Sequence, residues 1–322
     1  MDPIEQQMTP PGACLPIVTC AGEPAGLTKQ PWKHSIQSPL VTAAGSPRHR
    51  GIDLIATADA SEQVLAGEIS YGLIDKALGD EEVDLFVCRT GAWQLLATVV
   101  TGSADPADGR FELHLTGDQR LPIGRRPIFA SVRGDRSSVQ LLAVVLPSGG
   151  KVAVSDIDGT LTSYENEYPE SLITGAQVKV QDGAPEAFSA LAKSCYQPVY
   201  LTARGSVFTE STRKWLNDTG FPVGPLRLAP NLITLPGETT VDYKANTMIA
   251  LQSSRLTIAV GNGNRASDAQ AYKQVGVATD HIFLKRPEYS SEIDPVIARG
   301  DAVGNDSYRL LVPTFSAYPR AP

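Results

Sequence analysis

The stretch that decides the fold is Val152–Thr162, which reads VAVSDIDGTLT. Its apolar half, Val152–Ile157, is typical of a strand in a parallel sheet, where both faces are covered and the apolar run is continuous. In open α/β sheets, ligands bind beyond the carboxyl ends of the strands, and Asp156 and Asp158 fall at that end. Because alternate residues of a strand point to the same side, we expect the two carboxylates to converge on one point.

Two carboxylates held close together repel each other unless a cation lies between them. Oxygen ligands suit a hard ion such as Mg²⁺, which keeps several waters and takes the phosphate group of a substrate. This predicts Asp156 and Asp158 as Mg²⁺ ligands. Taken alone, the pair has a simpler interpretation, a strand end followed by an Asx turn at Asp158-Gly159.

Residues 149–322 alternate between strand and helix patterns. The predicted elements are a helix from 182, a strand 198–202, a helix 206–217, a helix from 243, a strand 256–260 and a helix 266–274. Strands that alternate with helices indicate a doubly wound, parallel α/β sheet. The pattern after Pro287 is mixed and predicts no element.

Residues 41–148 have a different pattern, in which short apolar runs are bounded by turn residues. The runs are 51–56, 83–88, 93–100, 110–115, 127–132 and 139–146. Several short strands at regular spacing predict a β-sandwich domain. Residues 1–40 are rich in Pro, Gly, Thr and Gln without periodicity, which indicates an extended N-terminal arm.

Arginines are frequent in the predicted β-sandwich, and they have two interpretations. One is a local positive face that binds anionic lipid or phosphate. The other, which the nearby aspartates favour, is a set of solvated strand ends. The arginines are Arg110, Arg120, Arg125, Arg126, Arg133 and Arg136.

The composition argues against several classes of protein. A net charge of -7 over 322 residues argues against nucleic acid as a partner. No apolar run approaches the roughly 18 residues of a transmembrane helix. Met1–Glu5 lacks the basic start and apolar segment of a signal peptide. We therefore expect a soluble or peripheral membrane protein and slightly favour the cytoplasm, the alternative being an exported chain from which a leader was removed.

The four cysteines leave the compartment open. Cys14 and Cys20 lie close together in a Pro-rich segment, where they form either a disulfide or two free thiols. Cys88 and Cys195 lie in apolar contexts typical of buried cysteines. Since there is no Cys-x-x-Cys and the four histidines are scattered, the sequence does not predict a zinc site.

Phosphoryl transfer to an aspartate requires a carboxylate nucleophile, a cation, a proton donor for the leaving oxygen and fixed donors for the phosphoryl oxygens. The sequence offers Asp156 as the nucleophile and Asp158 as the general acid and then general base. Thr202, at the end of its strand, is predicted to hydrogen-bond the phosphoryl group. Lys244 is predicted to place a positive charge beside the nucleophile and the phosphate.

Further residues complete the predicted site. Ala203 and Arg204, which follow Thr202, are predicted to bind the substrate. Asn264 and Asp268 are predicted to hold Mg²⁺ together with the two aspartates of the first stretch. Asp268 also has an ordinary interpretation, as an acid favoured at a helix N-terminus. The order of these residues behind successive strands is what favours a site.

Three segments resemble the haloacid-dehalogenase-like phosphatases, and most closely the lipin-type phosphatidate phosphatases. DIDGTLT at 156–162 resembles the first motif of that superfamily, while GNRASD at 263–268 with AYKQVGV at 271–277, and GPLRLAP at 224–230, resemble lipin segments. The resemblance covers about residues 152–284. It implies a Rossmann-like phosphatase domain, dependence on Mg²⁺, an aspartyl-phosphate intermediate and an immunoglobulin-like β-sandwich as a companion domain.

We therefore expect an α/β phosphatase domain that uses Mg²⁺ to hydrolyse phosphatidate to diacylglycerol. The alternatives are a phosphatase for a protein or soluble phosphate ester, and a phosphatidate-binding module without turnover. The second alternative resembles phosphatidylinositol-transfer-type proteins, in which the catalytic aspartates are eroded, and intact Asp156 and Asp158 favour an enzyme. No segment is predicted to form a separate lid domain, and an open site admits a phosphate presented on a membrane.

Overall fold

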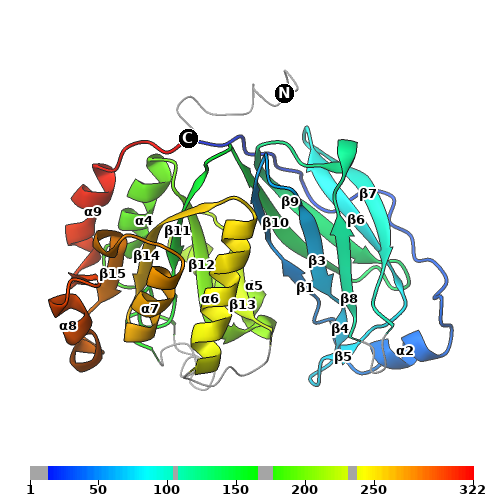
Figure 1. Ribbon diagram of the computed structural model, residues 1–322. Coiled ribbons are helices and arrows are strands. Elements are labelled where there is room, and N and C mark those ends of the chain that lie inside the picture. The colour runs from blue at the N-terminus through cyan, green and yellow to red at the C-terminus, as the bar shows by residue number, and fades with distance from the viewer. Residues whose placement is uncertain (1–13, 104–107, 166–176, 231–237) are drawn as a thin grey trace. The chain divides into compact units, whose positions relative to one another are not determined.

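The computed structural model describes residues 14–103, 108–165, 177–230 and 238–322 (Figure 1). The chain divides into two compact units, Met1–Leu146 and Pro147–Pro322, and each has its own sheets and its own hydrophobic core. Among the described residues, every helix is too short or too polar to span a bilayer.

Two main sheets form the described part of the first unit. The larger has the order β2-β10-β9-β6-β7, with bounds β2 (Leu54–Thr57), β10 (Ser138–Leu146), β9 (Gly124–Val132), β6 (Glu82–Arg89) and β7 (Ala92–Val100). The smaller has the order β1-β3-β8, with bounds β1 (Arg50–Ile52), β3 (Val64–Glu68) and β8 (Arg110–His114). Both sheets contribute to one core, in which Leu65 and Phe111 meet Leu85 and Ile128. The predicted β-sandwich is therefore confirmed.

Two short elements lie at one end of this unit. β4 (Ser70–Tyr71) and β5 (Lys76–Ala77) pair as an antiparallel hairpin, and the helix α2 (Gln37–Thr42) lies close to them (Figure 1). The chain after α2 runs along the hairpin, where an isolated bridge pairs Pro47 with Tyr71. The sequence did not predict β3, β4 or β5, because residues 58–80 contain no sustained apolar run.

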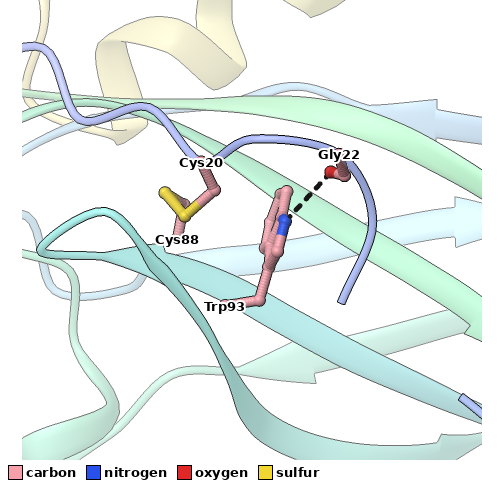
Figure 2. The surroundings of a disulfide bond; sticks show 4 residues. All are labelled: Cys20, Gly22, Cys88 and Trp93. Carbon is pink, nitrogen blue, oxygen red and sulfur yellow. Dashed lines mark hydrogen bonds between the residues drawn. A yellow bond between two sulfur atoms is a disulfide. The ribbon is translucent and has the colours of Figure 1, made fainter. Parts of the chain in front are cut away.

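The described part of the N-terminal arm packs on the β-sandwich. Val18 N donates to Arg125 O at 2.9 Å, and Gln30 N donates to Arg133 O at the same distance. Figure 2 shows the arm where Cys20 is joined to Cys88 of β6 by a disulfide. Beside this disulfide, the indole Nε1 of Trp93 donates to the carbonyl of Gly22 at 3.1 Å.

The predicted pairing of the cysteines is wrong, although Cys88 is buried as expected. Cys20 pairs with Cys88, at a sequence separation of 68, and not with Cys14. Cys88 and Cys195 are both disulfide-bonded, so neither is a free buried thiol, and no described cysteine is free. Sequence proximity suggested the nearest pair, whereas the path of the folded arm brings Cys20 against β6.

Several arginines of the first unit bind carboxylates or backbone carbonyls of the same unit. Arg133 binds Glu82 at 2.8 Å and Asp84 at 3.0 Å, and Arg136 binds Asp84 at 2.8 Å. Arg126 is almost completely buried, and its Nη2 donates to a backbone carbonyl. These three arginines are therefore held by contacts within the unit, so they are neither the solvated strand ends that the sequence favoured nor part of a free positive face.

A six-stranded parallel sheet is the centre of the second unit in its described residues. Its order is β13-β12-β11-β14-β15-β16, with bounds β13 (Leu226–Ala229), β12 (Gln197–Gly205), β11 (Lys151–Ser155), β14 (Thr257–Gly263), β15 (Ile282–Lys285) and β16 (Val303–Asn305). The helices are α4 (Ala184–Lys193), α5 (Thr209–Asp218), α6 (Glu238–Ser253), α7 (Ala266–Gln274), α8 (Ser290–Ala298) and α9 (Tyr308–Ser316). The core combines α4, α5 and α9 with the sheet, and α6 and α7 lie on the opposite face (Figure 1). The predicted parallel α/β sheet is confirmed.

Some boundaries differ from those predicted. β14 continues through Gly261-Asn262-Gly263, beyond the strand predicted at 256–260, because those residues pair with β15. Ser206 starts a 3₁₀ turn (Ser206–Phe208) before α5, and its hydroxyl donates to a carbonyl instead of capping a helix. The tail after Pro287, for which nothing was predicted, supplies two helices and the edge strand β16.

Candidate active site

The sheet order places the carboxyl ends of β12, β11 and β14 side by side. β11 pairs in parallel with β12 on one side and with β14 on the other. Residues 152–154 are completely buried, which is why this apolar run becomes a central strand. Asp156 follows β11 directly, Thr202 and Arg204 lie near the end of β12, and Asn264 follows β14. The predicted residues therefore lie together at the carboxyl ends of the three central strands.

Asp156 is buried, with 5% of its surface exposed. Lys244, which lies within α6, donates from Nζ to Asp156 Oδ1 at 2.8 Å. Thr160 Oγ1 donates to the other carboxylate oxygen at 3.2 Å. Both oxygens of this carboxylate are thus oriented by donors from within the second unit.

Lys244 also joins Asp156 to a second aspartate. Its Nζ lies 2.7 Å from Asp268 Oδ1, and the remaining oxygen of Asp268 accepts hydrogen bonds from the backbone N–H groups of Asn264 and Arg265 at 3.0 and 3.1 Å. Asp268 therefore does act as an acid at the N-terminus of α7, as its ordinary interpretation suggested. It also shares a buried ammonium group with Asp156.

Burial and charge act in opposite directions on these groups. Burial raises the pKa of Asp156, and the nearby Lys244 counteracts that rise. Burial alone would lower the pKa of Lys244, but the carboxylates of Asp156 and Asp268 raise that pKa well above its usual value. Lys244 is therefore a fixed positive charge at neutral pH, and it opposes, without cancelling, the rise that burial causes in the pKa of Asp156.

Asp158 contacts a different set of partners. Thr202 Oγ1 donates to Asp158 Oδ2 at 2.8 Å, and Arg204 binds the same carboxylate through Nη2 at 2.7 Å and Nε at 3.0 Å. The sequence predicted that Thr202 and Arg204 would contact substrate, and here both contact Asp158. Ala203 lies between them in β12 and is half-buried.

A group that sequence reasoning missed lies beside Asn264. Asn264 Nδ2 donates to Glu165 Oε2 at 2.8 Å, and Glu165 N donates to the carboxylate of Glu288 at 3.0 Å. Burial raises the pKa of Glu165. Gly159 makes this packing feasible, because a Cβ there would lie 2.1 Å from Asn264 Nδ2 and its φ is +66°. No strand end or motif spacing marks Glu165 in the sequence.

The acidic residues do not form a ready metal cluster. Among the described residues, no group of three or more His, Cys, Asp or Glu side chains is placed to hold a metal ion. The reason is visible in the contacts: Lys244 lies between Asp156 and Asp268, and Arg204 neutralises Asp158. The intervals in which a lid domain would be inserted include residues 166–176 and 231–237, which lie outside the described residues.

Both units match known sequence families. Residues 153–285 match the family described as the LNS2 domain of PITM 1-3, and residues 47–145 match the β-sandwich domain of PITM 1-3. The first match falls within the parallel α/β unit and the second within the β-sandwich unit.

Individual relatives agree with these matches. Membrane-associated phosphatidylinositol transfer protein 3 of Homo sapiens is 29% identical over 240 residues, which cover 73% of this chain and 23% of the relative. Protein retinal degeneration B of Drosophila melanogaster is 29% identical over 240 residues, which cover 73% of this chain and 18% of the relative. Phosphatidate phosphatase LPIN1 of Homo sapiens is 28% identical over 153 residues, which cover 43% of this chain and 17% of the relative.

The chain spans less than a quarter of the length of these relatives. Within that span, the resemblance of residues 152–284 to a haloacid-dehalogenase-like domain of the lipin type is confirmed. The chain carries a β-sandwich domain of the PITM 1-3 family followed by an LNS2 domain, which is haloacid-dehalogenase-like and distantly homologous to the lipin phosphatidate phosphatases.

Proposed function

We propose that this chain is a phosphatase that hydrolyses phosphatidate to diacylglycerol and phosphate through an aspartyl-phosphate on Asp156. The observation that carries the proposal is the surroundings of that side chain. Asp156 is a buried carboxylate at the end of a central strand, with an ammonium group on one oxygen and a hydroxyl on the other. A relative named as a phosphatidate phosphatase supports the choice of a lipid phosphate.

In this proposal an oxygen of Asp156 attacks the phosphorus atom, and the bond from phosphorus to the lipid oxygen breaks. Lys244 favours the ionised form of Asp156 against the effect of burial and offers positive charge to the phosphoryl group. Asp158 gives a proton to the leaving oxygen and then takes one from the water that attacks the aspartyl-phosphate. Thr202, whose hydroxyl contacts Asp158, orients that carboxylate.

The donor atoms at the site are chemically suited to Mg²⁺. Asp156 and Asp268 offer carboxylate oxygens, and Asn264 Oδ1 is buried without a hydrogen bond from any described residue. Hard oxygen donors of this kind are the ligands that Mg²⁺ prefers, and we propose these three residues, with Asp158, as its ligands. When bound, the ion would reduce the charge repulsion between the phosphate and the carboxylates.

Arg204 sets a condition on the proposed role of Asp158. While both oxygens of Asp158 accept hydrogen bonds from the guanidinium, neither oxygen is directed at a leaving group. A phosphate group is a competing acceptor for the guanidinium. We propose that the substrate phosphate draws Arg204 away from Asp158, which agrees with the prediction that Arg204 binds substrate.

The test is phosphate release by the full chain from phosphatidate in mixed micelles, with and without Mg²⁺. We expect turnover that requires Mg²⁺ and disappears in Asp156→Asn and Asp158→Asn, while Asp218→Asn, on the exposed face of α5, retains it. Undiminished turnover in a folded Asp156→Asn would refute the nucleophile. A parallel panel of soluble phosphate esters and phosphopeptides distinguishes the alternative in which the substrate is not a lipid.

A second candidate function is phosphatidate binding without hydrolysis. It is favoured by the ion pair that occupies Asp158 and by the relatives that are named as phosphatidylinositol transfer proteins. The same preparations distinguish it, because a binding module would retain phosphatidate at saturating Mg²⁺ and release no phosphate. Loss of that binding in Lys244→Met would assign it to the same site.

The disulfide bears on the compartment. Disulfides persist in oxidising compartments and are rare in the cytosol. The Cys20–Cys88 bond therefore supports an exported or luminal chain over the cytoplasmic one that the sequence slightly favoured.

A further inference from the structure

The end of the first unit that carries α2 and the β4–β5 hairpin has an exposed aliphatic surface. Leu73 and Ile74, at the turn of the hairpin, are 86% and 83% exposed, while Ile36 and Leu40 at the helix are 76% and 61% exposed. Leu73, Ile74 and Ile36 are the most exposed large hydrophobic residues in the described part of the chain. Single exposed hydrophobic residues are normal, whereas a group of them at one place indicates an interaction surface.

Direct contacts bring the helix and the hairpin together. Gly72 N, in the hairpin, donates to Ser46 O, just after the helix, at 2.9 Å, and a Cβ on Gly45 would lie 2.9 Å from the Cα of Gly72. Figure 1 shows α2 beside β4 and β5. Ile36 is the N-cap of α2 and Leu40 is four residues later, so the two lie on one face of the helix.

The charges beside these side chains favour an anionic partner. Asp75, the acid in the hairpin turn, is bound by Arg50, which also binds Glu68, so one guanidinium is shared by two carboxylates. Lys76 follows it and is exposed, and Arg48, which is half-buried, lies two residues before β1. Neither Lys76 nor Arg48 forms an ion pair with another described residue, so both positive charges remain available.

We propose that this surface docks the chain on an anionic lipid bilayer. The docking surface consists of Ile36, Leu40, Leu73, Ile74, Arg48 and Lys76. Aliphatic side chains that protrude from a turn and a short helix can enter the boundary between headgroups and acyl chains, while neighbouring cations remain among the phosphates. A stable protein interface needs about 800 Å² on each partner, which is more than four side chains on two narrow elements provide. Every residue of the docking surface belongs to the first unit, so the inference does not depend on the proposed phosphatase chemistry.

The test is cosedimentation of the full chain with vesicles of phosphatidylcholine, with and without phosphatidylserine. Phosphatidate is omitted, so that capture by the candidate active site does not contribute. We expect binding that is stronger with phosphatidylserine, and a partition coefficient that falls about tenfold or more in Leu73→Ser/Ile74→Ser. Lys76→Glu should weaken binding several-fold, and only to the vesicles that contain phosphatidylserine.

The matched control is Leu310→Ser, which removes a 68% exposed leucine from α9 in the second unit. Its partition should equal that of the unmodified chain, and thermal unfolding should confirm that all variants are folded. The proposal is overturned if the unmodified chain does not bind, or if Leu73→Ser/Ile74→Ser binds equally well. A dimer that this double variant dissociates, detected by light scattering, would also overturn it, since a second copy would then cover the surface.

Discussion

Arg204 holds Asp158 through Nη2 at 2.7 Å from Oδ1 and through Nε at 3.0 Å from each carboxylate oxygen. The guanidinium is fixed in turn by Thr212 on α5, whose hydroxyl lies 3.1 Å from Nη1. A planar guanidinium that binds both oxygens of a carboxylate fixes its direction as well as its charge. The orientation of Asp158 therefore depends on a residue that the sequence assigned to the substrate.

Arg204→Lys keeps the positive charge and removes the planar fork. We expect kcat/KM for phosphatidate to fall about tenfold to a hundredfold, because a single ammonium group cannot orient Asp158 or bind phosphate through two hydrogen bonds. Steady-state kinetics on mixed micelles measure this. The control is Arg299→Lys, at an exposed ion pair with Asp301, which should change little. Equal activity of Arg204→Lys and the unmodified chain would contradict the role of the fork.

Lys244→Met leaves Asp156 and Asp268 buried without the ammonium group that separates them. Removing one partner of a buried ion pair destabilises a protein by about 3–5 kcal/mol. Chemical denaturation should show a loss of this size, and added Mg²⁺ should recover part of it by placing a cation between the carboxylates.

The control for Lys244→Met is Lys214→Met, which breaks an exposed pair with Asp218 on α5. Such surface pairs contribute less than about 1 kcal/mol. If the two variants lose equal stability, the buried network around Asp156 does not contribute as described.

His49 should make stability depend on pH in the first unit. Burial lowers its pKa to about 4, although Asp135 acts in the opposite direction. Its Nε2 lies 2.7 Å from Ser137 Oγ, and its ring packs edge-on against Tyr71. Because the unfolded histidine takes up a proton near pH 6.5 and the folded one does not, stability falls as pH drops from about 6.5 to 4, by roughly 3 kcal/mol in all.

Urea denaturation at several pH values between 4 and 7 measures this dependence. His49→Gln should flatten the slope in that window, whereas His114→Gln, at a largely exposed position on β8, should leave it unchanged. An unchanged slope in His49→Gln would contradict the assignment.

Cys20→Ser/Cys88→Ser removes the bond that ties the N-terminal arm to β6. A cross-link that closes a loop of this length typically contributes about 2–4 kcal/mol by restricting the unfolded chain. The unfolding midpoint of the oxidised chain should therefore fall in this variant, and reduction of the unmodified chain should lower it at least as far, because Cys195 is disulfide-bonded as well. Peptide mapping without reduction should recover the linked peptides, and their absence from a folded chain would contradict the pairing.

The sequence by itself determined the two kinds of unit. The spacing of apolar residues predicts short, half-buried strands in residues 41–148, and buried strands that alternate with helices after residue 149. This spacing depends only on residues that are close together in the sequence. The first stretch, with Asp156 and Asp158, could be placed at a strand end for the same reason.

Only the tertiary structure decided which residues that lie far apart in the sequence contact one another. Lys244 and Asp268 are 88 and 112 positions from Asp156 in the sequence, yet the ammonium group of Lys244 on α6 contacts both aspartates, one directly after β11 and the other on α7. The pairing of Arg204 with Asp158, the contact of Glu165 with Asn264 and the Cys20–Cys88 bond are of the same kind. Local patterns set which face of an element is apolar, but charge pairs and disulfides depend on distances between elements, and those exist only once the chain has packed.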